Sequence, residues 1–89
     1  MKAIVTVIGK DQMGIIASVT NTLHAQKINV LDISQTILQD YFAMIMLTDI
    51  SACPLSISEL STLLTESGKA KGVDIRIQRE DIFNAMHRI

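Results

Sequence analysis

A short loop with two glycines and a carboxylate contains the residues best suited to chemistry in this 89-residue sequence. It reads Gly9-Lys10-Asp11-Gln12-Met13-Gly14 and connects an apolar, β-branched stretch to a segment with helical periodicity. The first turn of a helix presents unpaired backbone N–H groups and the positive end of the helix dipole, so it binds anions. Asp11 can accept hydrogen bonds from an ammonium group, while the amides of Met13 to Ile15 can bind a carboxylate. The loop therefore predicts a site for the zwitterionic end of an amino acid.

The same loop also fits a purely structural interpretation. Gly14 has no side chain, so a ligand or a neighbouring backbone can approach it closely. Asp11 is a residue type that caps helices, and Gly14 can serve only to relieve a steric clash. The sequence leaves both interpretations open.

Asn29 is the second candidate for ligand binding. It directly precedes Val30 at the start of an expected strand, and its amide can both donate and accept hydrogen bonds. This strand start is expected beside another subunit's first loop only if two copies of the domain pair. Asn is also common in turns that leave a helix, so a structural role for Asn29 stays open.

The remaining reactive side chains indicate neither catalysis nor metal binding. The two histidines and the one cysteine do not have the spacing of metal ligands, and three aspartates fall on separate expected strands. These residues are His24, His87, Cys53, Asp32, Asp49 and Asp74. The first loop lacks the arginine of a phosphate-binding acylphosphatase and the Cys-x-x-Cys of a metallochaperone. We therefore expect no enzyme, no catalytic residue, no metal and no cofactor.

Hydrophobic periodicity predicts the elements that position the first loop. Strands are expected at 2–8, 28–39, 41–50 and 73–78, and helices at 14–26, 56–72 and about 81–88. The first helix is expected to bury one face, formed by Ile15, Ile16, Val19, Thr20 and Leu23. The order βαββαβ predicts a ferredoxin-like α+β fold, with a four-stranded antiparallel sheet and two helices on one face. We expect a single domain over 1–89, with its core at 2–79.

Local sequence signals predict both ends of the second helix. Ser56-Ile57-Ser58-Glu59 matches a capping box, in which the serine hydroxyl and the glutamate each satisfy a backbone N–H group. Gly72 is expected to end this helix, and Gly68 to weaken it.

The third expected strand is apolar on both faces, which a sheet covered on one face does not explain. Tyr41, Ala43, Ile45 and Leu47 alternate with Phe42, Met44 and Met46. A strand with two apolar faces is normally buried on both. We expect its second face to be covered by the terminal helix, by a partner subunit, or by both.

Composition limits the classes of partner. The chain is 48% hydrophobic, 3% aromatic and has a formal net charge of −1, and a near-neutral surface favours self-association. With 8 Lys+Arg against 9 Asp+Glu, it lacks the basic excess that nucleic-acid binding requires. Its longest apolar run is too short to span a membrane, and no leader segment is recognisable. We expect a soluble, cytoplasmic homo-oligomer that binds neither nucleic acid nor membrane.

Three segments of the sequence resemble the ACT domain family. Val5 to Ile16 is similar to the family's opening of strand, Gly-x-Asp-x-x-Gly-[Ile/Val] and helix. Leu23 to Val30 is similar to its helix exit followed by Asn and a β-branched residue. The tail, 76–89, resembles stand-alone bacterial and archaeal ACT proteins, which are similar to the ACT halves of the glycine cleavage system transcriptional repressor.

The resemblance implies binding rather than catalysis. ACT domains commonly pair, often into an eight-stranded sheet, and bind amino acids between the first loop and a neighbour's second strand. By position, the ligand contacts are Asp11, Gly14 and Asn29 with the backbone amides of Met13 and Ile15. Two departures from the family pattern are Asp11, where a neutral amide is often found, and Met13, which replaces a frequent proline. The implied function is regulation of a separate metabolic enzyme or regulator; the alternative is a structural or protein-interaction module without a ligand.

Overall fold

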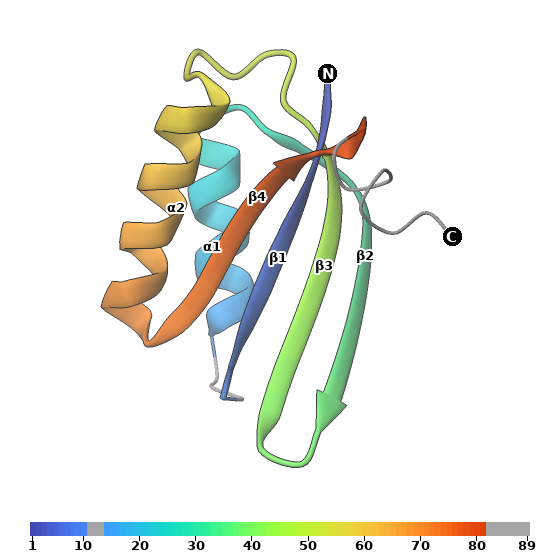
Figure 1. Ribbon diagram of the computed structural model, residues 1–89, viewed down its shortest axis with the longest axis vertical. Coiled ribbons are helices and arrows are strands. Elements are labelled where there is room, and N and C mark those ends of the chain that lie inside the picture. Colours follow the sequence, from blue (N-terminus) through green and yellow to red (C-terminus); the bar gives the residue numbers. More distant parts are fainter. Residues whose placement is uncertain (11–13, 82–89) are drawn as a thin grey trace.

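Four strands and two helices follow one another in the order βαββαβ (Figure 1). The structure is a computed structural model, and it describes residues 1–10 and 14–81. The elements are β1 (Lys2–Lys10), α1 (Ile15–Ala25), β2 (Asn29–Leu38), β3 (Tyr41–Asp49), α2 (Ile57–Lys71) and β4 (Val73–Arg79). All six correspond to elements expected from the sequence. The expected helix at about 81–88 lies outside the described residues, except for Asp81.

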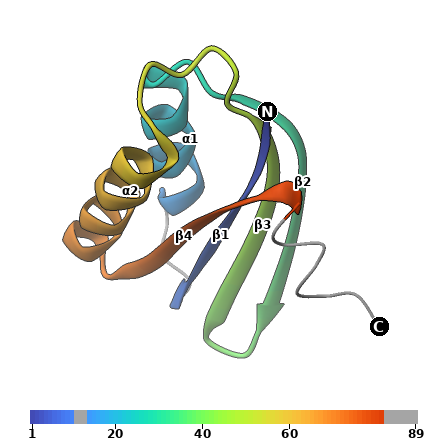
Figure 2. The same ribbon diagram turned by 45° about the horizontal axis from the view of Figure 1, so that its top comes forward.

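The four strands form one antiparallel sheet in the order β2-β3-β1-β4, with β1 and β3 in the centre. Val7 in the middle of β1 lies opposite Met44 of β3 and Ile75 of β4. Both helices lie on the same face of this sheet (Figures 1 and 2). The ferredoxin-like fold predicted from the sequence is therefore confirmed.

The hydrophobic core fills the space between this face and the helices. Alternate residues of the strands, among them Val5, Met46 and Ile75, are buried there together with one stripe from each helix. The stripe of α1 is narrower than predicted, because Ile15, Val19 and Leu23 are buried whereas Ile16 is 40% exposed. Successive helical residues are rotated by about 100°, which carries Ile16 away from the sheet.

Helix α2 begins and ends at the residues that the sequence indicated. The Ser56 hydroxyl accepts a hydrogen bond from the Glu59 N–H, and a Glu59 carboxylate oxygen accepts one from the Ser56 N–H, both at 3.1 Å. Gly72 ends the helix in the left-handed conformation, with φ 74°. Gly68 has a packing role that the sequence did not show: a Cβ there would lie 2.6 Å from the carbonyl oxygen of Val73. Helix and strand approach closely because this residue has no side chain.

The second face of the sheet, called here the open face, carries exposed apolar side chains. Ile8, Tyr41 and Ile45 point to this face and are 47%, 57% and 43% exposed, respectively. The other side of β3 behaves as expected, since Phe42, Met44 and Met46 are buried against the helices. Among the described residues, no helix lies over the open face (Figure 2). The described helices therefore cover one apolar face of β3 and leave the other exposed.

Candidate ligand site at the start of helix α1

The connection between β1 and α1 depends on a glycine at each end. A Cβ on Gly9 would lie 2.6 Å from Cγ1 of Val73, so its absence allows β1 and β4 to pass close together at this point. Gly14 precedes α1 with φ 88°, a left-handed conformation that side chains rarely adopt. No described atom lies within 4 Å of the position that a Gly14 Cβ would occupy. Gly14 is therefore required by its backbone conformation, and the described residues give no sign of a clash that it relieves.

The first turn of α1 has free hydrogen-bonding capacity among the residues that the structure describes. The first helical bond runs from the Ser18 N–H to the carbonyl oxygen of Gly14, at 2.9 Å. The N–H groups of Ile15, Ile16 and Ala17 precede this bond, and Gly14 has no side chain to cap them. The first turn holds no acidic residue, and the Lys10 side chain is exposed at the end of β1. This end of the helix has the positive potential that attracts a carboxylate.

Of the predicted contacts, Gly14 and Ile15 lie together at this helix start, whereas Asp11 and Met13 lie outside the described residues. Asn29 lies at the opposite end of the sheet. It pairs with Asp49, which in turn pairs with Lys2 at the start of β1, while Gly14 follows the end of β1. The length of β1, roughly 27 Å, separates the two ends. One copy of the chain therefore does not bring Asn29 to the first loop.

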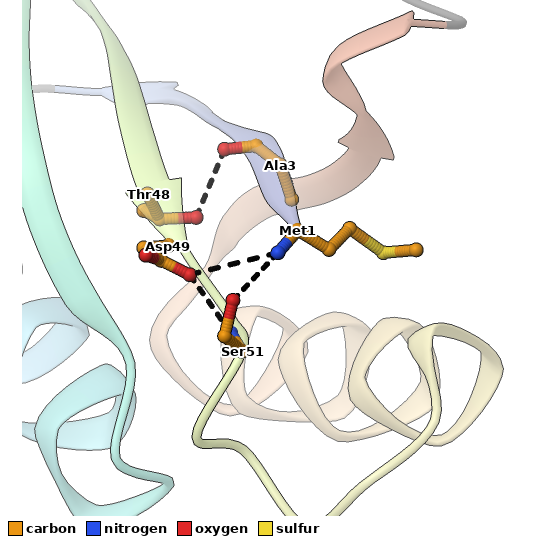
Figure 3. Close-up of polar contacts among 5 residues, drawn as sticks. All are labelled: Met1, Ala3, Thr48, Asp49 and Ser51. Carbon is orange, nitrogen blue, oxygen red and sulfur yellow. Dashed lines mark hydrogen bonds and ion pairs between the residues drawn. The ribbon is translucent and has the colours of Figure 1, made fainter.

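A polar cluster around Asp49, the residue that pairs with Asn29, lies at this end of the sheet (Figure 3). The Ser51 N–H donates to the Asp49 carboxylate at 2.9 Å, and the amino terminus of Met1 donates to the Ser51 hydroxyl at 2.6 Å. That amino terminus also lies 3.8 Å from the Asp49 carboxylate. Beneath this cluster, the buried Thr48 hydroxyl donates to the carbonyl oxygen of Ala3 at 2.9 Å. The cluster holds the ends of β1 and β3 together.

The Asp49 carboxylate stays ionised under ordinary conditions. Hydrogen bonds from the hydroxyl and backbone N–H of Ser51 lower its pKa, and the positive charges of the Met1 amino terminus and Lys2 lower it further. An anionic carboxylate thus lies across the strand pair from the Asn29 amide. Sequence reasoning treated Asp49 as isolated, because only the pairing of β2 with β3 places it opposite Asn29.

A shallow groove elsewhere contains none of the predicted site residues. It lies between the first turns of α2 and the end of β4 and is lined by Ile57, Ser58, Ser61, Thr62, Ile77, Gln78 and Arg79. Within the described parts of the chain, no three His, Cys, Asp or Glu side chains gather as metal ligands would. None of the helices there is both long enough and apolar enough to cross a membrane.

Comparisons with known proteins identify the family. The family model described as the ACT domain matches residues 2–78. The chain belongs to the ACT domain family. A UPF0237 protein of Clostridium acetobutylicum is 60% identical over 89 residues, which is 100% of both chains. ACT domains often serve as regulatory modules that bind ligands, and the family is regulatory rather than catalytic.

Solved structures of ACT proteins have the same fold. An ACT domain protein from Streptococcus pneumoniae has a TM-score of 0.84 and 39% sequence identity, with 98% of each chain covered. A putative glycine cleavage system transcriptional repressor has a TM-score of 0.73 and 21% identity, over 88% of this chain and 44% of that one. The predicted resemblance to both kinds of ACT protein is thus confirmed at the level of the fold.

Proposed function

We propose that this ACT domain is a non-catalytic regulatory module that binds a small metabolite, an amino acid, at an interface between two copies of the chain. The observation that carries the proposal is the separation of Gly14 and Asn29 by the length of the sheet within one copy. A site that uses both residues requires a second copy. Asp11 and Met13 complete the proposed site by their position in the family motif.

The edge strand β2 supports a way for two copies to meet. β2 has ten residues, and its outer edge is left unpaired by the sheet order. Ile33 and Ile37 point toward the helix side of this edge and are nevertheless exposed. A long, apolar edge strand is a template for pairing with another strand. Antiparallel pairing of β2 with its copy adds apolar contacts and satisfies the backbone groups of both edges.

This pairing also brings the two halves of the proposed site to the same end of the assembly. When two β2 strands run antiparallel, the start of one lies beside the end of the other. The end of β2 is on the side of the sheet where the first loop of the same copy lies. Asn29 of each copy is then placed at the end of the sheet that carries the α1 start of the other copy.

The chemistry of this combined site matches an α-amino acid. The free amides of Ile15 to Ala17 and the helix dipole attract the ligand carboxylate. The side chains of Asp11 and Asn29 can accept hydrogen bonds from the ligand ammonium group. A ligand shared by two copies stabilises their association by mass action, and this coupling allows the ligand to regulate a separate cytoplasmic enzyme or regulator.

Calorimetry and light scattering test this proposal together. We expect one or a few of the twenty amino acids to release heat on binding and to shift the protein toward the larger assembly. Asn29→Ala should weaken binding about tenfold, because one hydrogen bond to a charged group is lost, and should leave the fold unchanged. Asn21→Ala, at an exposed position on α1, is the matched control and should bind like the wild type.

A second candidate function is an assembly module without a ligand, and the exposed edge of β2 also supports it. No heat with any amino acid, combined with a stable dimer, would favour this alternative. A monomer that binds an amino acid with full affinity would contradict the shared site.

A further inference from the structure

The layer of helices stops short of β2 at the end of the sheet where α1 begins. Ile37, near the end of β2, lies opposite Phe42 of β3, which in turn lies opposite Gly9 of β1. Residues opposite each other in an antiparallel sheet point to the same face, so Ile37 and Phe42 share the helix side. Phe42 is only 3% exposed, whereas Ile37 is 60% exposed. The helices therefore cover β3 in this row of the sheet and leave the side chain of β2 uncovered.

A second exposed isoleucine lies in the first turn of α1. Ile16 is 40% exposed, although its neighbour Ile15 is buried. Connections from one strand through a helix to a parallel strand, such as that from β1 through α1 to β2, are right-handed. In that arrangement, the rotation of about 100° from Ile15 to Ile16 carries the Ile16 side chain toward the side of α1 on which β2 lies. Ile16 and Ile37, called here the isoleucine pair, therefore face the same exposed region beside the free N–H groups of α1.

The elements that carry the isoleucine pair have no charged side chain nearby. Helix α1 contains no Asp, Glu, Lys or Arg, and neither does the part of β2 from residue 33 to residue 38. Lys10 lies opposite Tyr41, which points to the open face, so the Lys10 side chain points away from the pair. Asp40 lies in the turn that follows β2. Because a charge without a partner is costly to remove from water, these surroundings favour an uncharged, apolar group.

We propose that the amino acid bound at the start of α1 has an apolar side chain of the size of leucine or methionine, and that Ile16 and Ile37 contact this side chain. The inference rests on the proposed function, because it names the class of amino acid for the same site. The Ile16 N–H is itself one of the free amides of α1, so a carboxylate bound there holds the rest of the ligand close to the Ile16 side chain. Covering the isoleucine pair removes apolar surface from water and favours the bound state.

Pairing of β2 with the β2 of another copy leaves the helix side of Ile37 accessible to the ligand. Strand pairing joins the backbone groups along the edge, whereas side chains stand roughly perpendicular to the sheet. The end of β2 that carries Ile37 is the end to which the proposed pairing brings Asn29 of the other copy. The side chain of the ligand and its ammonium group are thus bound at the same end of the assembly.

Calorimetry of the full chain with five amino acids tests the proposed specificity. Leucine and methionine should bind about tenfold more tightly than alanine, because each adds several carbon-sized groups that are buried against the isoleucine pair. Methionine, glutamine and lysine have side chains of similar length but different polarity. Glutamine and lysine should therefore bind more weakly than methionine, since burial of their polar ends is not compensated.

A matched pair of variants on β2 separates ligand specificity from assembly. Ile37→Ser should lower the ratio of leucine affinity to alanine affinity about threefold or more, and it should leave the fold intact because Ile37 is largely exposed. Ile33→Ser is the control, since Ile33 lies on the same strand and face and is 46% exposed, but is four residues, about 13 Å, farther from the end of β2. Both variants should weaken β2 pairing to a similar extent. Only Ile37→Ser should change the affinity ratio, and Ile16→Ser should change it in the same direction.

The possible results distinguish this inference from the proposed function. Equal affinity for leucine and alanine, or equal ratios in Ile37→Ser and Ile33→Ser, would overturn the apolar specificity and leave the shared site in place. Tighter binding of lysine than of methionine would also overturn it and would indicate Asp40 as the partner of the ligand side chain. No binding of any amino acid would contradict the proposed function and this inference with it. In the leucine complex, NMR should show contacts between the ligand methyl groups and those of Ile16 and Ile37, and their absence at saturation would place the ligand side chain elsewhere.

Discussion

The two helices of this domain begin in opposite ways. At the start of α2, Ser56 and Glu59 satisfy each other's backbone N–H groups through both hydrogen bonds of a capping box. At the start of α1, Gly14 offers no side chain, and no described residue caps the first turn. A cap stabilises a helix by about 1 kcal/mol, so its omission has a cost. The end of α2 is thus satisfied by its own residues, whereas the first amides of α1 have no side-chain cap from the described residues, and the proposed ligand would bind these amides.

The strongest test of this comparison uses two glycines with the same backbone strain. Gly14 and Gly72 both have positive φ, so Gly14→Val and Gly72→Val should each destabilise the fold by about 1–3 kcal/mol. Only Gly14→Val should also abolish amino-acid binding, because its side chain lies over the free amides of α1. Denaturant unfolding and calorimetry measure the two effects. Equal binding by both variants would mean that the first loop is only structural.

Removal of the α2 cap should have a smaller effect, and on stability alone. Ser56→Ala removes the acceptor for the Glu59 N–H and should cost about 1 kcal/mol, which lowers the Tm by roughly 4–8 °C for a domain of this size. Ligand affinity should be unchanged, since α2 does not contribute to the proposed site. Ser58→Ala, at an exposed position in the first turn, serves as the control. A loss of affinity in Ser56→Ala would remove the functional distinction between the two helix starts.

Substitution of Asp49 should cause the smallest change in stability. This residue lies opposite Asn29, at the end of the sheet away from Gly14. Its pKa is lowered in the folded protein, chiefly by the hydrogen bonds from Ser51. The ionised carboxylate therefore stabilises the fold above the ordinary Asp pKa of about 3.9, and this contribution is lost as the pH falls through the lowered folded value. Asp49→Asn should be less stable than the wild type at pH 7, and the two unfolding curves should converge in acid. If the difference in stability between Asp49→Asn and the wild type persisted at low pH, its cause would be packing and not the charge of the carboxylate.

Local rules explain why much of the fold was predictable. The capping box at Ser56 and the left-handed end at Gly72 depend only on neighbours in sequence, and both are confirmed. Ile16 was placed on the wrong face because five residues were assigned to a stripe that buries only three of them fully. The core packs on the narrower stripe because the sheet touches only one side of α1.

The candidate site was only partly predictable, since it depends on long-range pairing. The helix start at Gly14 and Ile15 follows from the sequence motif. The position of Asp49 opposite Asn29 does not, because a register shift between Val30 and Asp32 separates the start of β2 from the rest of the strand. Each inserted residue moves the following side chains to the other face of a sheet. No rule based on alternation along β2 alone could place Asn29 on the side where it lies.

The unequal edges of the sheet determine how far assembly can proceed. Residues 29–38 of β2 carry a single charge, Asp32, whereas the shorter β4 carries Asp74, Arg76 and Arg79. Charged edge strands resist pairing, so β4 is protected from the strand addition to which β2 is open. Pairing of β2 with the β2 of another copy uses the same edge on both copies and has twofold symmetry. Such a contact is complete in a dimer and leaves no β2 edge for a third copy. In the proposed pairing through β2, the charged β4 edges of the dimer would therefore oppose further growth by edge-to-edge addition.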